Sequence, residues 1–202
     1  KSEALGSRQA GFAAEGEYTM LDEEIHSKFD YDTGHHRYAG TAVEVIKKYQ
    51  GEAGDAKKLH DRLQHVIDEY ASPEWAVAAI ARQGSLYDSL RTGLYNTRAP
   101  QLKLFDAKTE KILEKFANSD NPDDQDKVDQ IRQQTTEAWR AARERELNGA
   151  DEVMVTRYAQ AVLLARRYNV RNPAVNRAIQ RLAFFTDILV EGKMKQYATN
   201  VQ

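Results

Sequence analysis

Apolar residues recur at spacings of three and four along most of this 202-residue chain, and this period limits the possible folds more than any other feature. Side chains at that spacing share one face of an α-helix, whereas half-buried strands show a period of two, which is hardly seen here. Only four prolines and eleven glycines interrupt the pattern. The sequence therefore predicts an all-α fold, and its 41% hydrophobic residues are enough for the core of a single domain over residues 1–202.

Turn and cap signals divide the chain into seven or eight expected helices. Three pairs, Ser72-Pro73, Asn121-Pro122 and Asn172-Pro173, each predict a helix start, because Ser and Asn are good N-caps and Pro is tolerated in the first turn. Short connections favour antiparallel hairpins stacked in chain order. The expected helices cover residues 6–29, 43–70 (interrupted at 51–54), 73–94, 102–116, 122–148, 151–168 and 173–197.

Charge gives no general reason to expect nucleic acid or an anionic membrane as a partner, because 29 Lys and Arg residues nearly balance 31 Asp and Glu residues. The distribution is uneven: residues 1–36 hold 8 acids and 3 bases, and residues 151–202 hold 8 bases and 4 acids. These two stretches are interpreted as solvated helix faces, with an end-to-end docking surface as the alternative. No apolar run is long enough for a transmembrane helix, and the first ten residues lack the apolar core of a signal peptide.

Four aspartates between residues 120 and 126 suggest a calcium loop at first sight. An EF-hand loop needs Gly at its sixth position and Glu at its twelfth, but counting from Asp120 these positions hold Gln125 and Ile131. A helix start fits better, with Asn121 as the cap and Asp123 and Asp124 near the positive end of the helix dipole.

Other metal and catalytic signals are weak. The chain has no cysteine, which removes thiolate ligands and nucleophiles. His60 and His65 are five residues apart, about 140° around a helix, so they do not share a face. His35-His36 is expected in a surface loop. Neither phosphate-loop nor hydrolase nor zinc-protease motifs occur, so no cofactor, metal or catalytic residue is predicted.

A glycine inside an expected helix, Gly84, requires an explanation because it costs about 1 kcal/mol relative to Ala. A residue without a side chain lets a second helix approach closely, and we expect Gly84 to have this role. Tetratricopeptide repeats carry a large apolar residue, Gly four positions later and Tyr three further on. Ile80, Gly84 and Tyr87 have that spacing, although Gln83 stands where Leu is usual.

The longer string HVIDEYASPEWAVAAIARQGSLYDSL resembles tetratricopeptide-like proteins of the cell envelope in myxobacteria and related deltaproteobacteria, among them components of the adventurous gliding motility machinery. The resemblance covers residues 10–95, so residues 1–97 are the better-matched half and residues 98–202 would add further helical hairpins. It implies a stacked superhelix. The matching residues are Tyr70, Ser72, Pro73, Glu74, Trp75, Ala76, Val77, Ala78, Ala79, Arg82, Gly84 and Tyr87.

The resemblance also implies a periplasmic interaction scaffold that binds other proteins of an envelope complex and catalyses no reaction. Self-association stays open. The alternatives are the helical domain of a cell-wall processing enzyme and a cytoplasmic adaptor. Aromatic and basic residues on exposed helix faces are the expected partner contacts, because such side chains combine apolar area with hydrogen bonding. They are Arg82, Gln83 and Tyr87, and the cluster Arg166, Arg167, Tyr168 and Arg171.

Overall fold

The protein is described here from a computed structural model, which covers residues 7–30, 36–97 and 103–184. These residues form helices and connecting segments, with a single isolated bridge between Thr41 and Lys103 in place of any strand. The all-α prediction is therefore confirmed. The helices are α1 (Arg8–Phe29), α2 (Ala42–Tyr70), α3 (Pro73–Asn96), α4 (Ala107–Ala117), α5 (Pro122–Tyr168) and α6 (Pro173–Leu182).

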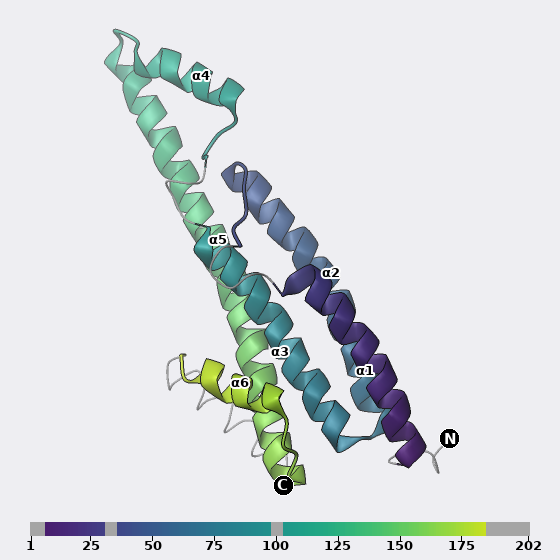
Figure 1. Cartoon of the computed structure of the whole chain (residues 1–202). Coiled ribbons are helices and arrows are strands. Elements are labelled where there is room, and N and C mark those ends of the chain that lie inside the picture. The colour runs from purple at the N-terminus through teal and green to yellow at the C-terminus, as the bar shows by residue number, and fades with distance from the viewer. Residues whose placement is uncertain (1–6, 31–35, 98–102, 185–202) are drawn as a thin grey trace.

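Helix α3 is the centre of the molecule, and the other long helices lie around it (Figure 1). It packs most extensively on α5 and also contacts α1, α2 and α6. At 47 residues, α5 is about 70 Å long and extends well beyond the other helices. The short helix α4 folds back on one end of α5, and α6 folds back near the other end (Figure 1).

The sequence of α3 explains its central place, because it is apolar on nearly every face instead of one. Its buried residues include the run from Val77 to Ala81, followed by Leu86, Leu90 and Leu94. Small side chains dominate this run, so neighbouring helices can come close on several sides. By contrast, α1 and α2 bury single stripes, exemplified by Leu21 and Ile25 in α1 and Leu63 in α2.

Caps fix most of the helix starts that the sequence indicated. Asn121 accepts a hydrogen bond from the backbone of Asp123, and Asn172 does the same for Ala174. Both bonds satisfy backbone N–H groups that have no partner within the helix. Ser72 is also an N-cap by position and Pro73 follows it, but the Ser72 side chain makes no capping hydrogen bond.

Two expected helix breaks are absent, and these predictions were wrong. Helix α2 continues through residues 51–54, and α5 continues through residues 148–151. A glycine in a helix costs about 1 kcal/mol, which the burial of one neighbouring apolar side chain offsets. Buried Ala56 and Leu59 follow the first site, and buried Ala150 and Met154 follow the second.

Two other expected helices have different bounds. The helix predicted over residues 102–116 begins only at Ala107, where Asp106 caps it by accepting hydrogen bonds from Lys108 and Thr109. Helix α6 begins as expected and ends at Leu182. Ala183 and Phe184, which were expected to be helical, form a turn, and the rest of the stretch predicted to reach residue 197 lies beyond the described residues.

Within the described ranges the chain forms six helices, not the seven or eight expected, since α5 replaces two of them. A tetratricopeptide-like superhelix is not confirmed, because the helices do not stack mainly on their chain neighbours. The face of α3 that carries Ile80 and Gly84 packs on α5, more than 70 residues later, where Ala161 lies in one cluster with Ile80.

Gly84 is at the closest contact between α3 and α5. A Cβ atom at this position would lie 2.6 Å from Cδ1 and 2.8 Å from Cε1 of the Tyr158 ring. Real Cβ atoms essentially never approach so closely. Tyr158 is only 4% exposed, so its ring has little room to move aside. The expectation that Gly84 permits a close helix contact is confirmed, although the partner is α5 and not the next helix in the chain.

We predict that Gly84→Ala destabilises the protein by about 1–3 kcal/mol, because the new methyl group collides with the fixed Tyr158 ring. The matched control is Gly54→Ala, at a helix position where nothing lies within 4 Å of the new Cβ. There the better helix propensity should stabilise the protein by about 0.5–1 kcal/mol. Urea unfolding measures both values, and two changes of the same sign would contradict the prediction.

Candidate functional site

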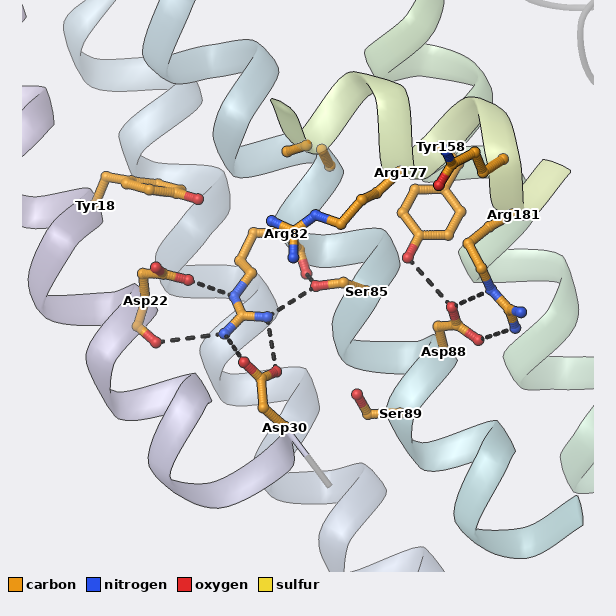
Figure 2. A pocket seen from close by; sticks show the side chains of 13 residues that line it. Tyr18, Asp22, Asp30, Arg82, Ser85, Asp88, Ser89, Tyr158, Arg177 and Arg181 are labelled. Carbon is orange, nitrogen blue, oxygen red and sulfur yellow. Dashed lines mark hydrogen bonds and ion pairs between the residues drawn. The ribbon is translucent and has the colours of Figure 1, made fainter. Parts of the chain in front are cut away.

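A polar cleft lies between α1, α3 and α6, and we call it the arginine cleft. Its volume is about 400 Å³, within the range of ligand sites. Helix α3 forms the floor with Ala81, Arg82, Ser85, Asp88 and Ser89 (Figure 2). The walls consist of Tyr18, Asp22 and Asp30 from the α1 side, and Tyr158, Ala174, Arg177, Gln180 and Arg181 from α5 and α6.

Arg82 joins the floor to the α1 wall (Figure 2). Its Nη1 and Nη2 donate to the two carboxylate oxygens of Asp30 at 2.8 and 3.0 Å, and Nη1 also donates to Ser85 Oγ. Its Nε lies 2.6 Å from Asp22 Oδ1, and Nη2 donates to the Asp22 carbonyl. Partial burial would raise the pKa of Asp30, but hydrogen bonds from Arg82 and His26 outweigh it and hold that pKa below its usual value. Arg82 is thus a structural cation that is paired with two aspartates.

Asp88 joins the floor to the α6 wall in the same way. Arg181 donates from Nε and Nη2 to the two Asp88 oxygens at 2.6 and 2.5 Å, a bidentate pair. The Tyr158 hydroxyl donates to Asp88 at 3.4 Å. Burial, with the Asp88 charge as a second cause, raises the pKa of Tyr158, so this hydroxyl stays protonated at physiological pH.

Arg177 differs from the other two arginines because it has no ion pair or hydrogen bond among the described residues. Its guanidinium extends from α6 into the cleft toward Arg82 (Figure 2). Tyr18, whose ring packs 5.3 Å from that of Trp75 between centroids, directs its hydroxyl into the same space. Burial and the charge of Asp22 raise the Tyr18 pKa to about 12. Within the part of the chain that the structure describes, the cleft thus offers a cation without an ion pair and a protonated hydroxyl.

Two other hollows have more apolar linings. An apolar groove of about 300 Å³ lies between α2 and α5, where Val43, Ile46 and Trp139 contribute to its walls. A third hollow lies between α4, α5 and the segment before α4, next to the ion pair of Glu110 and Arg132. Among the described residues, no group of three or more His, Asp or Glu side chains is arranged to hold a metal ion, and no helix is long and apolar enough to cross a membrane.

Of the residues expected to contact a partner from α3, only Arg82 lines the arginine cleft. Gln83 is fully buried and faces α2, where its Nε2 donates to the His60 carbonyl at 3.0 Å. The interpretation of Gln83 as a partner contact is therefore wrong, because it replaces the usual Leu as a core residue. Tyr87 is partly buried, and its ring meets that of His60 edge to face with centroids 5.7 Å apart.

The basic and aromatic cluster of Arg166, Arg167, Tyr168 and Arg171 lies at the end of α5 and just after it. All four side chains are exposed, and the Arg167 guanidinium lies 5.6 Å from the centre of the Tyr168 ring. None lines the arginine cleft. The cleft residues that the sequence did not indicate, such as Arg177 and Asp88, are ordinary charged residues until α3 and α6 pack together.

A buried polar cluster on the other side of α3 was also missed. Arg157 donates to His60 Nε2 at 2.9 Å, so the proton of neutral His60 is on Nδ1. His60 Nδ1 and Gln83 Oε1 are buried without hydrogen-bond partners. Burial, reinforced by the positive charge of Arg157, lowers the pKa of His60 to about 4. Because His60 and Arg157 lie 97 residues apart in the sequence, no local pattern indicates this contact.

No known protein family, curated protein or solved structure matches the chain. The fold and the cleft therefore define the protein by themselves: an all-helical protein built around a buried central helix, with a polar cleft between its first, third and last described helices.

We predict that Arg82→Met destabilises the protein by about 1–3 kcal/mol, because Asp22 and Asp30 lose the cation that neutralises them. The matched control is Arg62→Met, which removes an exposed ion pair with Glu24. Such a surface pair contributes about 0–1 kcal/mol. Thermal unfolding of both variants measures the difference, and equal losses would show that Arg82 is an ordinary surface charge.

Acid should weaken the fold through His60. Its pKa is about 4 in the folded protein, whereas an unperturbed histidine has a pKa of 6.5, so its contribution is complete above pH 6.5 and is lost as pH falls toward 4. After allowance for partial exposure, this amounts to about 1–2 kcal/mol between pH 7 and pH 5. Lys57, Asp61 and Arg157 are the charged groups that act on it.

The measurement is urea unfolding at pH 7 and pH 5 for the protein and for His60→Gln, a neutral side chain at both values. The variant should lose less stability than the parent over this interval. Part of the loss should remain, because partial burial also lowers the pKa of His36. An unchanged pH dependence in His60→Gln would contradict the assignment.

Proposed function

We propose that this chain is a non-catalytic scaffold that binds a segment of another protein in the arginine cleft. The observation that carries the proposal is Arg177, which has no ion pair or hydrogen bond among the described residues, in a cleft whose other arginines are held by aspartates. Rigid walls with a few unsatisfied polar groups are typical of sites that recognise a partner.

A second support for the proposal is that ion pairs within the chain hold the walls of the cleft in place. The ion pairs of Arg82 and Arg181 join α3 to α1 and α6. Because these contacts are already made within the chain, the two walls are fixed before a partner arrives, which lowers the entropy lost on binding. A scaffold benefits from such a preformed surface.

We further propose that the partner belongs to a multiprotein complex of the bacterial cell envelope, as part of a gliding motility machinery and on the periplasmic side. This step is supported by the sequence from Tyr70 to Tyr87, which resembles tetratricopeptide-like envelope proteins. The partner is another protein and not nucleic acid, in keeping with the near balance of charge.

Site-specific photo-crosslinking in the producing cells tests the proposal. A p-benzoylphenylalanine at Gln180, an exposed residue of the cleft wall, should crosslink to one segment of one other protein, which mass spectrometry identifies. The control position is Gln130, which is exposed on the far half of α5. The same products from both positions, or none from Gln180, would contradict the cleft as the binding site.

Deletion of the gene, and of the gene for the crosslinked protein, tests the envelope role. We expect both deletions to give the same loss of gliding. Normal gliding in both strains would remove this part of the proposal. Crosslinks from Gln180 to glycan strands instead of protein would favour a domain of a cell-wall processing enzyme.

A further inference from the structure

The first half of α5, which extends beyond α3 (Figure 1), carries a mostly apolar stripe along one face. Its members follow one another in alternating steps of three and four residues, the heptad spacing along which two helices pack in a coiled coil. They are Val128, Ile131, Thr135, Ala138 and Ala142. Of these five residues only Val128 is buried, and Ile131 is 42% exposed. The stripe is therefore a helix-packing seam that the described residues cover only in part.

The stripe also forms one wall of the apolar groove between α2 and α5. Val43 and Ile46 of α2 belong to the opposite wall, and Val43 is 74% exposed. The α5 wall is lined by small side chains such as Ala138 and Ala142, which allow the axis of another helix to come close. Helices α2 and α5 thus resemble half of a helical bundle whose remaining helices are supplied from elsewhere.

We propose that a second copy of this chain fills the groove, with the α5 helices of the two copies packed antiparallel along the stripe. In a two-fold symmetric dimer each copy inserts its α5 into the groove of the other, so one contact covers both grooves. Helices α2 and α5 of the two copies then form a four-helix bundle. The groove shares no lining residue with the arginine cleft, so dimerisation is independent of the proposed binding of a partner there.

The distribution of charge along α5 favours a second copy as the occupant. Residues 122–129 contain four aspartates and one lysine, whereas residues 140–146 contain three arginines and two glutamates. Two antiparallel α5 helices place the acidic stretch of each copy opposite the more basic stretch of the other. Two parallel helices would place each stretch beside its own counterpart, where like charges repel. The helix therefore complements itself in one direction, as a symmetric interface requires.

The register follows from the stripe. With Ile131 of one copy opposite Ala138 of the other, the exposed Ile131 side chain enters the groove beside the small wall residues. Asp124 precedes Ile131 by one heptad and Arg145 follows Ala138 by one heptad, so these two charges also face each other across the dimer. The Arg145 side chain is 71% exposed in the single chain and can reach a second copy.

Sedimentation velocity of the whole chain measures the association. We expect a reversible equilibrium between monomer and dimer with a dissociation constant in the micromolar range, because the contact is small for a permanent dimer. Raising the salt concentration should weaken it, since exposed charges contribute. A chain that stays monomeric at about 500 μM would overturn the proposal, whatever else fills the groove.

A matched pair of variants tests the stripe. Ile131→Glu should weaken the dimer about a hundredfold, because the substitution places a charge in both symmetric contacts and each costs about a factor of ten. Ile179→Glu makes the same change on α6 and should alter the association by less than about twofold. The two isoleucines are 42% and 46% exposed, so both variants should keep the helical circular dichroism spectrum of the parent. Equal weakening in both would overturn the proposal.

Single cysteines test the direction, because the chain has none of its own. Lys127 and Ala142 each lie four residues outside the pair of Ile131 and Ala138, so they face each other in the antiparallel register. A mixture of Lys127→Cys and Ala142→Cys should therefore give a heterodimer with a short bismaleimide, and each variant alone should give little product. Crosslinks of each variant to itself, as parallel helices would give, or no crosslink in the mixture, would overturn the assignment.

Discussion

The contact between Gly84 and the Tyr158 ring determines how close α3 and α5 lie, and the rest of the structure depends on that distance. Helix α6 follows α5 after a short turn at Asn169, so the position of α5 also sets the position of α6. With α5 displaced outward by one methyl group, Arg181 would move away from Asp88 and the cleft wall would shift. A core contact between two helices is therefore also the support of a surface site.

Helix α3 also organises the charges. Asp22 and Asp30 of the α1 side pair with Arg82 of α3, whereas Arg181 of α6 pairs with Asp88, further along α3. The central helix thus contributes one charge of each sign to the cleft, Arg82 and Asp88, and each attracts the wall of opposite charge.

The sequence predicted the helical class and most helix starts because both depend on local properties: apolar spacing, and caps such as Asn121 and Asn172. It predicted breaks at Gly51 and Gly149 wrongly, since burial of distant partners outweighs a local propensity. Of the residues that line the cleft, only Arg82 was predicted from the sequence to contact a partner. Arg177 and Asp88 lie 89 residues apart, and their common site arises from tertiary packing that no local pattern encodes.

The three arginines of the cleft have different roles because their side chains contact different residues. Arg82 and Arg181 have carboxylates within reach along α1 and α3, so they hold the walls together, and their charges are already balanced when a ligand arrives. Arg177 lies on the same helix as Arg181 but one turn earlier, where the small residues Ala81 and Ser85 of the floor offer no charge.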